Sequence, residues 1–184
     1  MKTLKTLLNT IMLVAFVFTA QITFAQDKVT KSINEVITQN PTAKVSPKIV
    51  RDYLNAIINN KMDVAESLLS DTYVMTGPSN GESSTKTELI DTWKEIHKVR
   101  TNPKNEMIHY TWRILEGIYK GDWVGIWGTY TFTESGTEVI VPYNYLAMVE
   151  GGKIQEARIF YDKLSILTAM GGTVTPHNKK YSYL

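Results

Sequence analysis

The stretch Gly151-Gly152-Lys153-Ile154-Gln155-Glu156-Ala157-Arg158-Ile159-Phe160-Tyr161-Asp162 combines the signals of a turn, a strand and a helix start. Gly151-Gly152 is typical of a tight hairpin turn, because glycine adopts positive φ at little cost. From Ile154 to Tyr161, alternate side chains lie on opposite faces of a strand. Asp162 is suited to cap the N-terminus of a following helix. We therefore expect a β-hairpin whose last strand leads directly into a helix.

Three further runs of β-branched and aromatic residues precede this strand, at residues 107–118, 123–133 and 139–149. Turn-forming residues separate them, which predicts successive hairpins of one antiparallel sheet. Gly125, Gly128 and Pro142 are expected at bends or bulges. Long antiparallel strands also twist and coil. The sheet is therefore expected to curl into a cone with a cavity at its open end.

Helical signals flank these strands. Ser46-Pro47 reads as an N-cap followed by proline, and apolar residues then recur with helical period up to Ile58. Asp63 is expected to cap a second, shorter helix, and Thr85 with Glu88 forms a capping box for a third. These patterns predict an α+β fold, in which a cone-shaped, curled antiparallel sheet has helices packed on its concave side.

The N-terminal region has the pattern of a signal peptide. Lys2 and Lys5 precede an apolar run from Ile11 to Phe18, and Ala25 ends a segment suited to cleavage. The polar interruptions after this run argue against a membrane anchor. We expect a signal peptide at residues 1–25, a linker with one possible short helix at 26–45, a domain at 46–172 and a tail at 173–184. The mature protein is then periplasmic or secreted, with no stable membrane span.

Composition narrows the function classes. The chain has no cysteine, which excludes disulfides, thiol nucleophiles and cysteine metal sites. Of 20 basic residues, Lys2 and Lys5 leave with the signal peptide, so 18 remain against 18 acidic ones. No basic excess supports nucleic-acid binding. His97, His109 and His177 have no ligand spacing to one another, so neither a metal site nor a cofactor is expected.

Several phrases in order resemble the nuclear transport factor 2-like superfamily, in its SnoaL-like polyketide cyclase branch. They are Tyr53-Leu54-Asn55-Ala56, the segment from Leu68 to Val74, Gly152-Lys153-Ile154 and Phe160-Tyr161-Asp162. The likeness covers about residues 46–172. It implies the cone-shaped fold predicted above. That fold hosts isomerases, cyclases, dehydratases, epoxide hydrolases, binding proteins and association domains, so it does not determine the function.

The catalytic positions of enzymatic relatives are mostly unoccupied here. The carboxylate base that precedes a proline in ketosteroid-isomerase-like members corresponds to Thr76-Gly77 before Pro78. The resemblance matches Tyr53 to an oxyanion-hole tyrosine and Asn144 to its carboxylic partner, so both are weak catalytic candidates. The aspartate of epoxide-hydrolase-like members falls on Ile159, and residues 123–133 hold neither arginine nor aspartate.

The same resemblance implies which side chains face the cavity and which face outward. The expected cavity residues are Tyr53, Trp93, Trp112, Asn144, Leu146, Met148, Ala157, Ile159 and Tyr161. On the last strand, Glu156, Arg158 and Phe160 are expected on the outer face, where relatives often dimerise.

Three hypotheses follow. The first is an exported domain that binds a small, largely apolar molecule in the cone, without the acid and base groups of the enzymes. The second is an isomerase, cyclase, dehydratase or hydrolase in which Tyr53 and Asn144 polarise a carbonyl. Its base would be Glu82, Asp91 or His97. The third is a dimeric association module that uses the outer sheet face.

Overall fold

The computed structural model describes residues 32–174. The signal peptide predicted at residues 1–25 lies outside them, as do residues 175–184 of the predicted tail. Contacts divide the chain into two units, Met1–Val36 and Ile37–Leu184. Helix α2 (Ile33–Val36) belongs to the first unit and is the short helix anticipated in the linker. None of the helices in residues 32–174 has the length and apolar character needed to cross a membrane.

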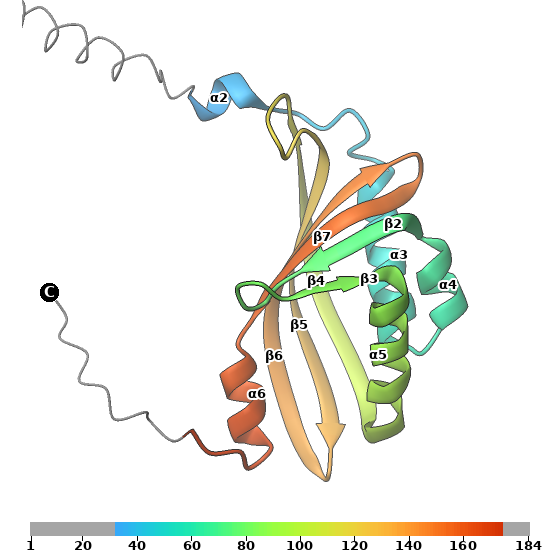
Figure 1. Cartoon of the computed structure of the whole chain (residues 1–184), viewed down its shortest axis with the longest axis vertical. Helices are drawn as coiled ribbons and strands as arrows, with labels where there is room; N and C mark the ends of the chain where they lie inside the picture. The colour runs from blue at the N-terminus through green and yellow to red at the C-terminus, as the bar shows by residue number, and fades with distance from the viewer. Residues whose placement is uncertain (1–31, 175–184) are drawn as a thin grey trace, which may run out of the picture. The chain divides into compact units, whose positions relative to one another are not determined.

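The second unit contains one curled sheet of seven strands in the order β1-β4-β5-β6-β7-β2-β3 (Figure 1). Their bounds are β1 (Ile37–Thr38), β2 (Leu69–Thr76), β3 (Ser83–Thr85), β4 (Arg100–Ile114), β5 (Gly121–Glu134), β6 (Thr137–Glu150) and β7 (Lys153–Tyr161). All neighbours are antiparallel except β2 and β7, which run parallel. The expectation of a wholly antiparallel sheet is therefore corrected to a mixed one.

The hairpin predictions are confirmed at both ends of β6. Ser135 and Gly136 have φ of 50° and 81°, and Gly151 and Gly152 have φ of 59° and 78°. Two successive residues with positive φ are the requirement of the two-residue turns that join twisted strands. The first long strand begins at Arg100 rather than near Met107. The polar residues before Met107 also pair with β5, and Arg100 pairs with Glu134.

Four helices accompany the sheet: α3 (Ser46–Ile58), α4 (Met62–Ser67), α5 (Lys86–Val99) and α6 (Lys163–Ala169). The capping box of Thr85 and Glu88 is confirmed, and the Asp162 carboxylate accepts a hydrogen bond from the Ser165 backbone N–H at 3.0 Å. The capping roles predicted for Ser46 and Asp63 are wrong. Helix α3 begins one residue earlier than expected, after Val45, and α4 begins two residues earlier, after Lys61. Both side chains therefore lie within the first turn.

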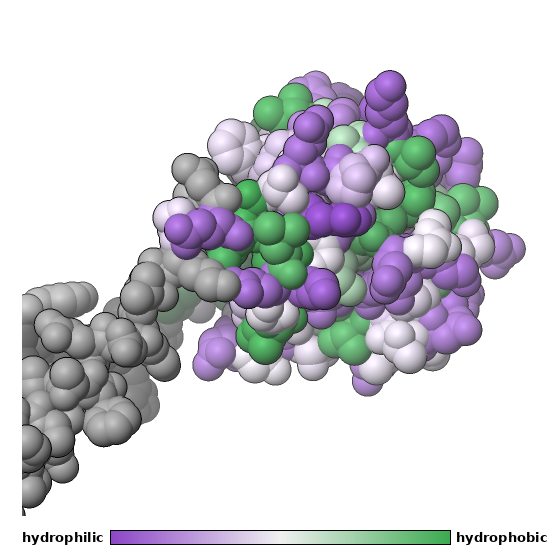
Figure 2. Space-filling view, turned by 90° about the horizontal axis from the view of Figure 1, so that it is seen from above, coloured by the Kyte–Doolittle hydropathy of each residue, from purple (hydrophilic) through white to green (hydrophobic). Residues whose placement is uncertain are grey.

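Helices α3 to α5 gather on one side of the sheet, and α6 follows β7 and contacts β6 (Figure 1). We call the sheet face toward α3 and α5 the inner face and the opposite one the outer face. The core lies between the helices and the inner face. Its largest fully buried side chains include Tyr53, Tyr73, Phe132, Tyr145 and Ile57. At the surface seen in Figure 2, apolar side chains form separate groups between polar ones.

Part of the predicted linker belongs to the domain. Strand β1 pairs with the end of β4, and Asn40 is 2% exposed. The Asn40 amide donates a hydrogen bond to the Trp123 carbonyl, and its oxygen accepts one from the Thr42 N–H. Residues 37–45 are therefore a fixed part of this unit, which corrects the linker boundary at residue 45.

Candidate functional site

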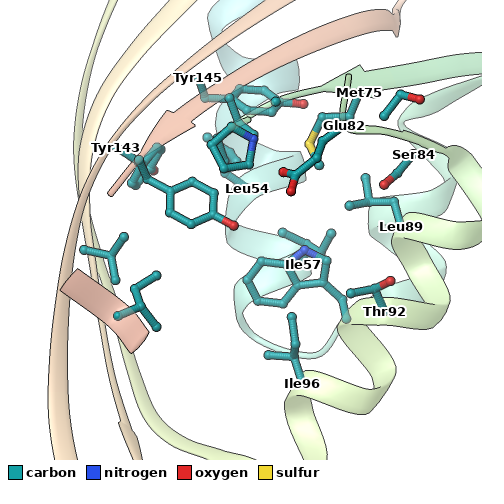
Figure 3. Close-up of a pocket in the computed structure, with 18 of the residues that line it drawn as sticks. Leu54, Ile57, Met75, Glu82, Ser84, Leu89, Thr92, Ile96, Tyr143 and Tyr145 are labelled. Carbon is teal, nitrogen blue, oxygen red and sulfur yellow. The ribbon is translucent and has the colours of Figure 1, made fainter. Parts of the chain in front are cut away.

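A cavity of about 490 Å³ lies between α3, α5 and the inner sheet face (Figure 3). Leu89, Trp93 and Ile96 line it from α5, where a spacing of three to four residues places them on one face of the helix. Leu54 and Ile57 line it from α3 in the same way. The helical walls of the cavity are thus largely apolar.

The sheet contributes the opposite wall through residues that lie side by side across two strands. Tyr143 pairs with Tyr161, and Tyr145 pairs with Ile159, so all four side chains share the inner face. All four line the cavity. The Tyr143 ring lies over Gly128, where a Cβ would come within 2.4 Å of it. Glycine at residue 128 is therefore what lets this ring pack flat against β5.

Three tyrosines form a buried cluster beside the cavity. The Tyr73 and Tyr145 hydroxyls are 3.1 Å apart, and the rings of Tyr53 and Tyr145 stack with centroids 6.0 Å apart. Burial raises the pKa of Tyr73 to about 12, and it holds the pKa values of Tyr53 and Tyr145 well above the ordinary tyrosine value. These hydroxyls are therefore uncharged at neutral pH.

Two polar groups point toward the middle of the cavity, the Glu82 carboxylate and the Tyr143 hydroxyl (Figure 3). The Tyr143 hydroxyl donates its proton to the Asn105 side-chain oxygen at 2.9 Å, and burial raises its pKa. Its oxygen therefore remains free to accept a hydrogen bond. Both groups present acceptors to a molecule in the cavity.

The charged side chains around the cavity are paired. Glu82 accepts a hydrogen bond from Lys163 Nζ at 2.5 Å, and this bond lowers the pKa of the Glu82 carboxyl. Arg100 Nε lies 3.0 Å from a Glu134 carboxylate oxygen, and its guanidinium lies 3.8 Å from the centre of the Phe132 ring. A charged ligand would therefore find no unpaired countercharge among these groups.

The structure places four of the predicted cavity residues on the cavity wall, namely Tyr53, Trp93, Ile159 and Tyr161. Ala157 faces the same side but is buried in the core at 1% exposure. Four predictions are wrong, because the side chains lie on the outer face: Trp112, Asn144, Leu146 and Met148.

For the three residues of β6, Asn144, Leu146 and Met148, the cause lies in strand geometry. The sequence reading placed β6 one residue out of phase, and a shift of one residue exchanges the two faces of a strand. Asn144 pairs with Trp127 and Phe160 on the outer face, and its amide lies 3.4 Å from the Tyr110 hydroxyl. It cannot act as the polar partner of Tyr53 in the cavity. In its place, Tyr143 and Tyr145 face the cavity from β6.

Of the three candidate bases, only Glu82 reaches the cavity. Asp91 is exposed and pairs with Lys94 at 3.1 Å. His97 Nε2 lies 2.7 Å from the Ile57 carbonyl oxygen, and its ring packs against Trp93. A carboxyl whose pKa is lowered is a weak base, so Glu82 is poorly tuned for proton abstraction. Within residues 32–174, no group of three or more His, Cys, Asp or Glu side chains is placed to hold a metal ion.

The outer face carries an exposed apolar row. Ile108 pairs with Trp127, and Asn144 lies between Trp127 and Phe160, so the row crosses four strands. Ile108, Trp127 and Phe160 are 65%, 61% and 50% exposed. Arg158 faces the same side, and its guanidinium lies 4.6 Å from the centre of the Tyr119 ring. The placement of Arg158 and Phe160 agrees with the outer face expected for them.

The fold is similar to that of solved proteins described as ketosteroid isomerase-like and NTF2-like. A hypothetical protein of ketosteroid isomerase-like fold from Catenulispora acidiphila, in complex with trimethylamine, has a TM-score of 0.56 at 19% identity. The match covers 71% of this chain and 98% of that one. No family model matches the sequence, and no curated protein does.

Two further solved structures show how varied the functions on this fold are. A protein assigned as a SnoaL-like polyketide cyclase, from Shewanella denitrificans, has a TM-score of 0.56 at 9% identity, with 69% of this chain and 97% of that one covered. An epoxide hydrolase-like protein from M. tuberculosis has a TM-score of 0.54 at 15% identity, with 70% and 91% covered. At such low identities the likeness establishes the fold and leaves the chemistry to the site itself.

Proposed function

We propose that this chain binds a small, uncharged and largely apolar molecule that carries a hydroxyl or another hydrogen-bond donor. The observation that carries the proposal is the character of the cavity. Its helical walls are largely apolar and the charged side chains around it are paired. The Glu82 carboxylate and the Tyr143 hydroxyl point inward and can each accept a hydrogen bond. Such a site favours a ligand that is mostly apolar and carries one hydrogen-bond donor. We also propose that the protein is exported, as the pattern of residues 1–25 suggests.

Binding is favoured over catalysis by the state of the polar groups. An enzymatic role would need a base whose pKa is tuned toward the working pH. The lowered pKa of Glu82 works against this. The tyrosine cluster stays protonated, and its Tyr73 and Tyr145 hydroxyls already contact each other. The isomerase, cyclase, dehydratase or hydrolase alternative remains a second proposal, with Tyr53 as donor and Glu82 as base.

A matched series of naphthalenes tests the proposed ligand class. 2-Naphthol is uncharged at pH 7 and has a donor, 2-methoxynaphthalene lacks the donor, and 2-naphthoate is charged. Thermal shift and calorimetry should show that 2-naphthol binds most tightly and 2-naphthoate least. At ten times its Kd, a ligand raises stability by about 1.4 kcal/mol. Preferential binding of 2-naphthoate would contradict the uncharged class, and no binding by any of the three would count against the proposed function.

Filling the cavity should abolish binding while leaving the fold intact. Ile96 lines the cavity from α5, so the larger indole of Ile96→Trp would occupy part of the cavity. We expect the 2-naphthol affinity to fall at least tenfold, as measured by calorimetry. Val99→Trp is the matched control, because Val99 lies on the same helix and is 55% exposed. Equal affinities of the two variants would show that 2-naphthol binds elsewhere.

A second role, self-association, is supported by the exposed apolar row on the outer face. We propose a symmetric dimer in which the rows around Trp127 and Phe160 of two copies pack together. Trp127→Lys should weaken the dimer at least a hundredfold in light scattering after size exclusion, because it places a charge in the centre of the row. Glu138→Lys, on the outer face of β6 but away from the row, should leave the dimer unchanged. A wild-type monomer at micromolar concentration would contradict the proposal.

A further inference from the structure

Helix α6 closes one side of the cavity. Ile166 on α6 and Tyr161 at the end of β7 line the cavity, and both also line a neighbouring hollow of about 570 Å³. Arg100 is the third residue common to the two. The helix therefore stands between the ligand cavity and a second hollow, and its displacement would join them.

The attachment of α6 is light. None of its residues is buried, and Leu164 and Leu167 are each 51% exposed. Ile166 and Met170 are the side chains that pack against the core. Few buried apolar contacts make a segment prone to local opening at low cost in free energy.

One polar contact ties the helix to the rest of the domain. In residues 32–174 the hydrogen bonds of α6 are local, such as those of Ser165 with Asp162, with the exception of Lys163 to Glu82. Glu82 lies in the loop between β2 and β3 and points into the cavity (Figure 3). The two side chains are 41% and 50% exposed, and ion pairs exposed to this degree are weak. The pair is therefore placed to break and reform readily.

We propose that α6 is a lid on the cavity, that the Glu82–Lys163 pair holds it shut, and that ligand enters and leaves when this pair opens. The inference rests on the proposed binding function. The ligand must pass between the β2–β3 loop, which ends at Glu82, and the start of α6 at Lys163. Opening there would expose Ile166 and Tyr161 and widen the cavity into the neighbouring hollow.

A reversible cross-link tests the lid directly, because the chain has no cysteine of its own. The double variant Glu82→Cys with Lys163→Cys is joined by a short bis-methanethiosulfonate linker, which dithiothreitol cleaves. Binding of 2-naphthol is followed by stopped-flow quenching of tryptophan fluorescence, since Trp93 lines the cavity. We expect the association rate of the cross-linked protein to be at least tenfold below that of the same variant after reduction. Both forms lack the Glu82 carboxylate, so its loss as a ligand contact affects both equally.

The control joins another ion pair in the same manner. Asp71 and Lys86 lie 3.1 Å apart and tie β2 to the start of α5, so cross-linking Asp71→Cys with Lys86→Cys should leave the association rate unchanged. Equal rates in the cross-linked and reduced Glu82–Lys163 variant would overturn the lid while leaving the binding function in place. Absence of 2-naphthol binding by the wild-type protein would overturn both.

Discussion

Raising the pH from 10 to 12 is expected to destabilise the folded protein steeply, because the buried tyrosine cluster cannot ionise in place. Burial raises the pKa of Tyr73 from 10.0 to about 12. A tyrosine in the unfolded chain loses its proton near pH 10. Above this pH the unfolded state gains free energy by ionising, whereas the folded state does not until its own higher pKa is passed.

The sign and size follow from this difference. A folded-state pKa that is raised stabilises the fold below pH 10, and the stability is lost as the pH rises toward 12. Two pKa units correspond to about 2.7 kcal/mol for Tyr73 alone. Tyr53 and Tyr145 are shifted in the same direction by the same burial, so they add to the loss. Ionisation of these three tyrosines on unfolding is expected to remove a large fraction of the free energy of unfolding of a domain of this size.

Urea unfolding at pH 9, 10, 11 and 12, with phenolate absorbance recorded in parallel, measures the effect. The free energy of unfolding should fall with pH, and a late group of tyrosines should ionise only as the protein unfolds. Tyr73→Phe is the control, because it keeps the ring and removes one titrating hydroxyl. It should make the decline shallower by about 1.4 kcal/mol per pH unit at most. Ionisation of every tyrosine by pH 11 in a folded protein would contradict the account.

The sequence predicted most reliably the parts of the fold that local rules determine. Gly151-Gly152, the capping box at Thr85 and Glu88 and the cap at Asp162 each act through their own backbone, so a pattern of a few residues was enough. The inner and outer faces of β7 were also placed as expected. These elements fix the hairpins and the helix that closes the sheet.

The cavity itself was only half predictable. Its helical wall follows from the apolar spacing of α3 and α5, but the facing of β6 depends on its register with β5 and β7, which is a long-range property. The run from Tyr143 to Met148 carries large side chains on both faces, so its alternation did not reveal which face is buried. For the same reason, the pairing of Glu82 with Lys163, 81 residues apart, has no local signal.

Asn40→Ala is expected to lower the free energy of unfolding by about 2–4 kcal/mol, since three hydrogen bonds meet at one buried amide. The Asn40 Nδ2 donates to the Trp123 carbonyl at 3.3 Å. Its Oδ1 accepts from both the Thr42 backbone N–H and the Thr42 hydroxyl at 2.7 Å. Alanine would leave the Trp123 carbonyl and the Thr42 N–H without these partners in a site from which water is largely excluded.

The loss should spread because Thr42 is shared. Its hydroxyl also lies 2.6 Å from the Ser46 hydroxyl at the start of α3 and 3.3 Å from an Asp122 carboxylate oxygen. Asp122 in turn binds Arg113 through both carboxylate oxygens. Asn40 therefore connects the start of α3 to the β4–β5 hairpin, and groups coupled in one network do not lose energy independently.

Thermal and urea unfolding of Asn40→Ala measure the effect, with a fall in Tm of about 5–15 °C expected for this loss. Asn59→Ala is the matched control, because the Asn59 amide is exposed and donates to the Asn55 carbonyl of its own helix end. Exposed substitutions of this kind cost about 0.5 kcal/mol or less. If Asn40→Ala and Asn59→Ala lowered the free energy of unfolding by the same small amount, residues 37–45 would be a dispensable linker. The domain would then begin at α3, as the sequence pattern alone predicts.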